Sequence, residues 1–205
     1  MAGVVSWTQY RESIGDRSGL FAALVAHWPV RSALYLGSYV DLSPSTAIAA
    51  VTYVDTDARA ARFFADTALV DEELKGRTLP GAGQEVAFLN ADFTRGLDVP
   101  ETSTDLLISL FTVPAWEHCR RHLRPRGLLL ANSSHGEASL AAMDPALRLV
   151  AAVHHRAGRY HLDTAQLDTY LRPRRAEEAD AERIRSSGRG VTYTRPAFAY
   201  LFEQT

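Results

Sequence analysis

The stretch ALYLGSYVDLSPSTAIAAVTYVDTD, residues 33–57, decides the fold that we predict for this chain. It contains two short apolar runs, one ending at Gly37 and the other at Asp55. Between the runs, the serines and the proline of residues 42–50 are typical of the start of a helix. Strand, helix and strand in this order predict a βαβ unit, whose two parallel strands end at the same edge of a sheet.

The two residues that end the apolar runs indicate what such an edge could bind. A turn at Gly37 would let a ligand approach the backbone closely, and Asp55 could accept hydrogen bonds from ribose hydroxyls. Asp55 follows Gly37 by 18 residues, near the spacing of about 20 that a ribose-binding acid has in dinucleotide-binding folds. We therefore predict a nucleotide-type ligand at this edge, whereas Asp57 is expected to cap the next helix.

The rest of the chain alternates between strand and helix patterns. Further strands are predicted at residues 85–89, 105–111, 128–131, 147–154 and 191–202, and residues 160–162 either continue the strand at 147–154 or pair with it. Helices are predicted at residues 19–28, 58–70, 114–123, 137–143 and 164–171. We expect one α/β domain over residues 1–205, with an amino-terminal arm (1–19) and a helical insertion (163–190) before the last strand.

Composition excludes several classes of protein. The net charge of −2 provides no broad basic field for nucleic acid. Cys119 is the only cysteine, so neither an intrachain disulfide nor a cysteine-rich metal site is expected. The early apolar run, residues 20–28, is too short for a membrane span and does not have the form of a signal peptide. We expect a cytoplasmic protein without nucleic-acid or membrane partners.

Five segments together resemble the class I S-adenosylmethionine-dependent methyltransferases. Residues 51–55 resemble the second strand of that family with its ribose-binding acid, and 91–93 resemble its adenine-contacting segment. Residues 105–111 resemble its fourth strand, 123–130 its entry into strand five, and 193–202 its antiparallel seventh strand. The resemblance covers residues 20–204. It implies a three-layer Rossmann-like fold with a mostly parallel seven-stranded sheet, an antiparallel last strand and S-adenosyl-L-methionine as the cofactor.

The first motif of that family is altered here. An acid, one residue of any kind and then Gly-x-Gly-x-Gly are usual, but Tyr35 replaces the acid, and Tyr39 and Asp41 replace the second and third glycines. Tyr39 is expected to stack on the cofactor and Asp41 to hold its amino group. After the fourth strand, Thr-Val-Pro (112–114) replaces the Asp/Asn-Pro-Pro-Tyr signature of nucleic-acid methyltransferases.

The site residues follow from these positions. Cofactor contacts are predicted at Gly37, Ser38, Tyr39, Asp41, Asp55, Thr56, Asp92, Phe93, Ser109, Leu110 and Phe111. Substrate contacts are predicted at Tyr10, Trp116, Ser133 and Ser134. His135 is the predicted proton acceptor, with Asn132 beside it. Ser134 and Glu137 also have the spacing of a capping box. No metal site is predicted, because the histidines lack His-Glu-x-x-His spacing.

The sequence therefore predicts an enzyme that transfers a methyl group from S-adenosylmethionine to a small molecule, with secondary metabolism as one setting. An enzyme that uses the same cofactor for cyclisation or aminobutyryl transfer is an alternative. So is a non-catalytic domain that binds a ligand or a partner. A nicotinamide-dependent enzyme is a third, which the missing phosphate-binding glycines disfavour. The oligomeric state stays open, with a homodimer as one option.

Overall fold

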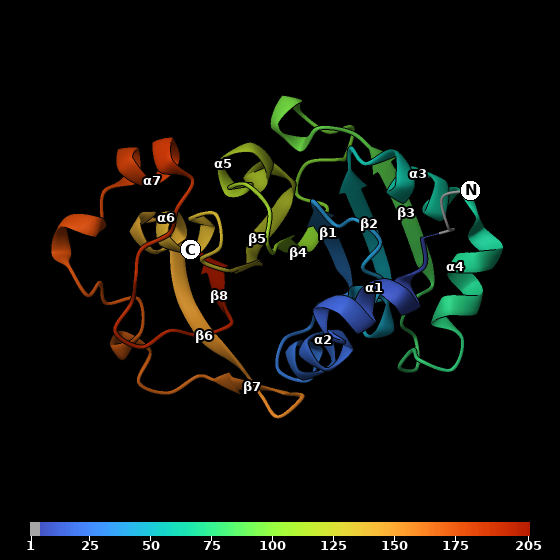
Figure 1. Ribbon diagram of the computed structural model, residues 1–205, viewed down its shortest axis with the longest axis horizontal. Helices are drawn as coiled ribbons and strands as arrows, with labels where there is room; N and C mark the ends of the chain where they lie inside the picture. Colours follow the sequence, from blue (N-terminus) through green and yellow to red (C-terminus); the bar gives the residue numbers. More distant parts are fainter. Residues whose placement is uncertain (1–4) are drawn as a thin grey trace.

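The computed structural model describes residues 5–205 and places its strands in one eight-stranded sheet of order β3-β2-β1-β4-β5-β8-β6-β7 (Figure 1). The strands are β1 Ser32–Leu36, β2 Ala50–Asp55, β3 Glu85–Asn90, β4 Thr104–Ser109, β5 Leu123–Ala131, β6 Leu147–Arg156, β7 Arg159–Asp163 and β8 Ala199–Gln204. The neighbours among β1 to β5 pair parallel, and β8 is antiparallel to both β5 and β6.

This topology confirms the predicted fold class. The sheet of the described residues has eight strands, one more than the seven predicted. The additional strand is β7, which pairs antiparallel with β6 as a hairpin. Residues 160–162 therefore form a separate strand beside residues 147–154. Residues 1–4 of the predicted amino-terminal arm lie outside the described residues.

Helices cover both faces of the sheet. They are α1 Trp7–Ile14, α2 Ser18–Val25, α3 Ala58–Ala65, α4 Thr67–Leu74, α5 Trp116–Cys119, α6 Glu137–Met143 and α7 Ala181–Ser187. Short 3₁₀ turns are η1 Ser43–Thr46, η2 Phe93–Arg95, η3 Arg120–His122, η4 Leu167–Thr169 and η5 Ala176–Glu178. None of the helices in residues 5–205 is long and apolar enough to cross a lipid bilayer.

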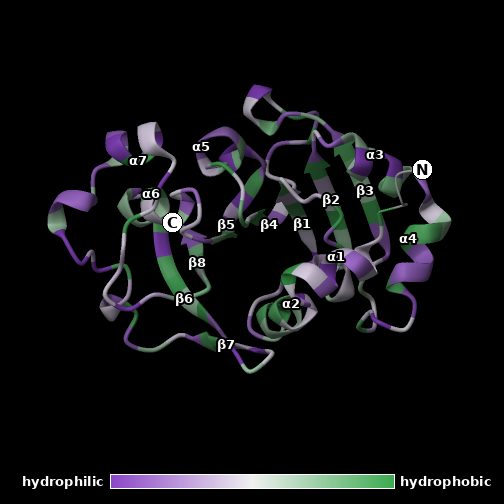
Figure 2. Ribbon diagram, viewed as in Figure 1, coloured by the Kyte–Doolittle hydropathy of each residue, from purple (hydrophilic) through white to green (hydrophobic). Residues whose placement is uncertain are grey.

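Alternation along β1 shows how the three layers form. Ala33 and Tyr35 join a core with α1, α2 and α3, whereas Leu34 and Leu36 join a second core with α5 and α6. Successive side chains of a strand point to opposite faces, so a strand that is apolar throughout is buried on both sides. Figure 2 shows green over much of β2, β3 and the covering helix α2, and purple over much of α7.

The helix predicted at residues 42–50 is replaced by the single turn η1. Side-chain hydroxyls compete with the helix here, because Ser43 donates to Asp41 and Ser45 bonds the Tyr53 hydroxyl. The Thr46 hydroxyl donates to the backbone oxygen of Ser43. The βαβ unit is therefore closed by a short crossover, and β2 already begins at Ala50.

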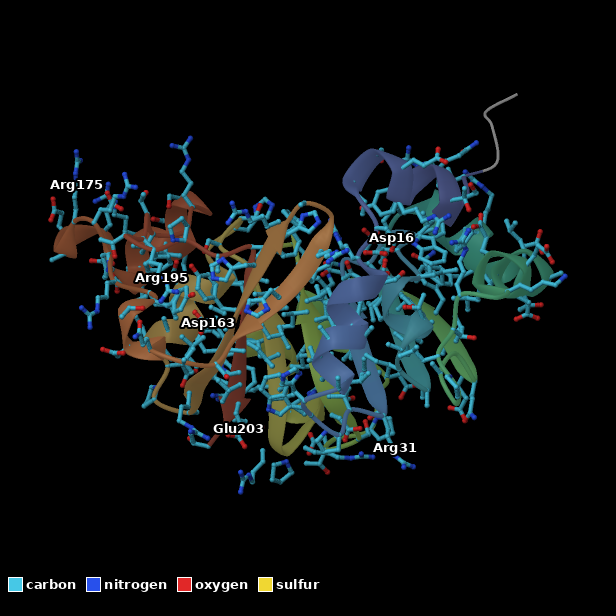
Figure 3. The ribbon with its side chains drawn as sticks, turned by 90° about the horizontal axis from the view of Figure 1, so that it is seen from below. Asp16, Arg31, Asp163, Arg175, Arg195 and Glu203 are labelled. Atoms are coloured by element: carbon cyan, nitrogen blue, oxygen red, sulfur yellow. The ribbon has the colours of Figure 1, made fainter. Side chains whose placement is uncertain are left out.

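The segment between β7 and β8 contains little of the predicted helix. Of the described residues 164–198, only α7 is α-helical, and η4 and η5 are single turns. The last strand starts at Ala199 and not at residue 191, since Pro196 has no N–H to donate to a ladder. Figure 3 shows Arg195 beside Asp163, and the Arg195 guanidinium donates to the Asp163 carboxylate at 2.9 Å. This contact fixes the end of the segment to the start.

Candidate functional site

A pocket of about 420 Å³ opens at the carboxyl ends of β1 to β4. It lies where the sequence predicts the ligand, because parallel strands end at one edge. Its lining residues are Gly37, Asp55, Thr56, Ala91, Asp92, Phe93, Thr94, Phe111, Thr112 and Val113. The pocket thus brings together six of the eleven predicted cofactor contacts, namely Gly37, Asp55, Thr56, Asp92, Phe93 and Phe111.

Asp55 presents its carboxylate at the end of β2. One oxygen accepts from the backbone N–H of Tyr39 at 2.7 Å, and the other accepts from that of Asp57 at 2.8 Å. A carboxylate offers about four acceptor positions. Two backbone bonds therefore fix the orientation of Asp55 and leave acceptor positions for hydroxyl groups of a ligand.

The turn after β3 forms the wall next to Asp55. Asp92 accepts hydrogen bonds from the backbone N–H and the hydroxyl of Thr94, at 3.0 and 2.7 Å. These bonds lower the pKa of Asp92 and start the turn η2, which buries Phe93. Asp92 therefore shapes this wall while its carboxylate is engaged by Thr94.

Phe111 forms the wall at the end of β4. Its side chain is 47% exposed, and its φ of 59° lies in the left-handed region. The Asn132 side-chain oxygen accepts from the Phe111 backbone N–H at 3.2 Å and so supports this conformation. Ser109 and Leu110, also predicted as contacts, are buried beneath this turn and do not line the pocket.

Gly37 closes the pocket toward the β1 turn. Its φ is +64°, and a Cβ atom there would lie 2.5 Å from the Thr112 hydroxyl oxygen. The turns after β1 and β4 are therefore in direct contact, and only glycine fits between them.

We expect Gly37→Ala to lower the free energy of unfolding by about 2 kcal/mol, through the positive φ and the collision with Thr112. Urea denaturation measures the loss, and Gly37→Ala combined with Thr112→Gly should recover the part due to the collision. A loss below about 0.5 kcal/mol would show that the two turns separate freely.

A buried ion pair lies behind the β1 turn. Asp41 is fully buried, and one of its oxygens accepts from the Arg17 guanidinium and the Tyr35 hydroxyl, both at 3.1 Å. Its other oxygen accepts from the backbone and hydroxyl of Ser43. Burial and the charge of Asp41 raise the pKa of Tyr35, which is therefore a neutral donor. In this arrangement Asp41 does not face the pocket, and neither does the buried Ser38.

Tyr39 turns outward from the same loop. Its ring meets Tyr10 edge-on with centroids 5.0 Å apart, and the Arg59 guanidinium lies 5.3 Å from its centroid. Tyr10 and Tyr39 thus flank the β1 turn, outside the set of residues that lines the pocket.

The loop after β5 reaches the pocket wall through the bond from Phe111 to Asn132, but its side chains do not line the pocket. None of Asn132, Ser133, Ser134 and His135 lines it, and the backbone oxygen of Ser133 packs against Gly190. His135 is half-buried, and its side chain makes no hydrogen bond among the described residues. The structure therefore separates the predicted proton acceptor from the predicted cofactor contacts.

The predicted capping box at the start of α6 is wrong. Gly136 occupies the N-cap position without a side-chain cap. Glu137, which is 1% exposed, instead accepts from the Ser109 hydroxyl at 2.9 Å and from the backbone N–H groups of Ala115 and Trp116. The buried Trp116 lines a separate cavity of about 260 Å³ between α5, α6 and α7.

Several site residues were not predicted. Thr112 and Val113 line the pocket directly after the predicted fourth strand, and Ala91 and Thr94 flank the predicted contacts Asp92 and Phe93. Their positions at strand ends could have identified them. Nothing in the sequence connects Arg17 with Asp41, which lies 24 positions further on.

Comparisons with solved structures found proteins to which this chain is similar in fold. A methyltransferase from Geobacter sulfurreducens matches with a TM-score of 0.50 and 12% identity, over 97% of this chain and 86% of that one. The N-methyltransferase NodS from Bradyrhizobium japonicum WM9, solved with S-adenosyl-L-homocysteine, matches with a TM-score of 0.45 and 13% identity, over 74% of this chain and 82% of NodS. The [4+2]-cyclase SpnF matches with a TM-score of 0.42 and 18% identity, over 62% of this chain. The match spans 46% of SpnF, which is less than half of its length.

The match with the Geobacter sulfurreducens protein, at a TM-score of 0.50, supports the assignment of the fold. The chain has the Rossmann-like fold of the class I S-adenosylmethionine-dependent methyltransferases, as the sequence predicts. No family model matches the chain, and no curated protein matches its sequence.

Proposed function

We propose that this protein is an enzyme that binds S-adenosylmethionine and transfers its methyl group to a small molecule. The observation that carries the proposal is the pocket at the ends of β1 to β4 with Asp55 on its wall, in a chain with the class I methyltransferase fold. We place the acceptor among small molecules because the net charge of −2 gives no attraction for nucleic acid. The proposal includes a cytoplasmic setting and leaves a homodimer open.

The residues of the pocket fit the nucleoside part of this cofactor. Asp55 and Thr56 would hold the ribose hydroxyls, and Asp92 and Phe93, in the segment that resembles the adenine-contacting one, would border the base. When bound, the cofactor supplies a methyl group activated on a sulfonium. The space for the amino-acid part of the cofactor is partly occupied by the protein itself, since Gly37 packs against Thr112 and Asp41 is paired with Arg17.

The chain's own residues would mainly position the reactants. Asn132 orients Phe111 through the backbone bond, and Tyr10 and Tyr39 would border the acceptor beside the β1 turn. His135 stays in the proposal as the proton acceptor, with Ser133 and Ser134 as acceptor contacts; this requires the loop after β5 to part from Gly190. Trp116 is not retained, because it is 3% exposed and faces another cavity.

Asp55→Asn is expected to weaken binding of 5′-methylthioadenosine and S-adenosylhomocysteine by about 100-fold, since charged acceptors of ligand hydroxyls contribute about 1.5–3 kcal/mol each. Calorimetric titration of the wild type and the variant measures this. Asp57→Asn is the matched control, because that carboxylate bonds Arg59 and caps α3 outside the pocket. Affinities of Asp55→Asn within threefold of the wild type would remove the pocket from the proposal.

A second candidate is a non-catalytic nucleoside-binding domain. The contact between Gly37 and Thr112 and the buried pair of Arg17 with Asp41 favour it, because both lie where the aminoacyl chain would pass. Incubation with S-adenosylmethionine and candidate acceptors separates the possibilities. S-adenosylhomocysteine indicates methyl transfer, methylthioadenosine indicates use of the aminobutyryl group, and no product favours the binding domain.

A further inference from the structure

The fold builds a buried site for a cation beside the pocket, and the protein's own Arg17 occupies it. The guanidinium donates to Asp41 at 3.1 Å and to the Tyr35 hydroxyl at 3.2 Å. Its carbon atom lies 4.8 Å from the centroid of the Phe111 ring, whose side chain also lines the pocket. A carboxylate, a phenol oxygen and an aromatic face stabilise any cation of suitable size, not an arginine alone.

Arg17 is held incompletely in this site. The residue is 6% exposed, yet its Nε–H has no hydrogen-bond partner. A buried donor without a partner is costly, so the guanidinium is less stable here than its contacts with Asp41 and Tyr35 suggest. Release of the side chain to water would satisfy that donor.

The position of Arg17 makes its release feasible. Arg17 precedes α2 and directly follows the exposed Asp16 of the turn between α1 and α2, which is labelled in Figure 3. α1 is eight residues long and carries one fully buried side chain, Trp7. Moving this turn would expose Asp41 to the pocket without disturbing a strand of the sheet.

We propose that Arg17 fills the subsite for the cationic amino end of the bound cofactor, and that binding of the cofactor displaces it from Asp41. The inference rests on the proposed function. Arg17 then acts as an internal competitor that determines specificity. Nucleosides without an aminoacyl chain bind without displacing it, whereas ligands with an ammonium group must separate Arg17 from Asp41 first.

Two ligands with the same nucleoside test this proposal. S-adenosylhomocysteine has the ammonium group, and 5′-methylthioadenosine lacks the whole aminoacyl chain. In Arg17→Met we expect affinity for S-adenosylhomocysteine to rise about tenfold, within the usual range for coupled sites. Affinity for methylthioadenosine should stay unchanged. Calorimetric titration of the wild type and the variant gives the ratio of the two ligands' affinities in each. In the variant, S-adenosylhomocysteine should also raise the melting temperature more than methylthioadenosine does.

Arg17→Gln provides a second variant in case Arg17→Met does not fold, because its amide can still donate to Asp41 but carries no positive charge, and it leaves Tyr35 and Asp41 in place. We expect it to raise S-adenosylhomocysteine affinity about threefold. Equal changes for both ligands in these variants would overturn the role of Arg17 and leave the pocket intact. Absence of binding of either ligand to the wild type and the variants would overturn the proposed function together with this inference.

Discussion

Asp41→Ala is expected to lower the free energy of unfolding by about 3–5 kcal/mol, the usual cost of removing one partner of a buried ion pair. The variant leaves the Arg17 guanidinium in the core without its carboxylate, and it also removes the acceptor of the Ser43 backbone and hydroxyl. Asp41 is fully buried, so water does not replace these bonds easily. Urea denaturation followed by circular dichroism measures the loss.

The matched control is Asp168→Ala, which removes an exposed carboxylate paired with Arg172 at 3.0 Å. Exposed pairs of this kind contribute about 0.2–1 kcal/mol. A variant with both Arg17→Met and Asp41→Leu should recover much of the loss, because it leaves no unpaired charge. If Asp41→Ala costs no more than Asp168→Ala, the Arg17 pair does not hold the β1 turn closed.

The strand ends and about half of the candidate site could be predicted from the sequence. They follow from the apolar runs of neighbouring residues and from the parallel arrangement of the strands. An apolar run such as residues 105–111 predicts a doubly buried strand, and parallel strands end at one edge. Gly37, Asp55 and Phe111 each come at the end of such a run, and they lie in one pocket. Predicting them required no knowledge of side-chain packing.

The remaining features depend on contacts between distant segments. Residues 42–50 have helix signals, but local hydroxyl bonds and the early start of β2 leave one turn. Asp41 was expected to face a ligand, yet Arg17 from another element pairs with it. Ser134 and Glu137 have capping-box spacing, but tertiary bonds to β4 and α5 take the Glu137 carboxylate. In each case a tertiary contact overrides a local preference.

Glu137→Ala is expected to lower the free energy of unfolding by about 3 kcal/mol. The variant leaves the Ser109 hydroxyl and the N–H groups of Ala115 and Trp116 without an acceptor. These bonds join the end of β4 to the start of α5, next to the turn that carries Phe111. We therefore expect nucleoside affinity to fall as well. Glu117→Ala is the matched control on α5, since that exposed carboxylate is paired with Arg185 at the surface.

The pH dependence of the Glu137 contribution has a defined sign. Burial raises its pKa above the ordinary value of 4.5 despite the hydrogen bonds it accepts, so the folded protein holds this proton more tightly than the unfolded chain. The stability that Glu137 contributes is therefore complete below pH 4.5 and decreases as the pH rises through the folded-state pKa. Glu137→Gln cannot ionise, so its deficit relative to the wild type should shrink with rising pH in urea titrations. A deficit that grows with pH would mean that the folded protein stabilises the carboxylate, and that the three donors outweigh its burial.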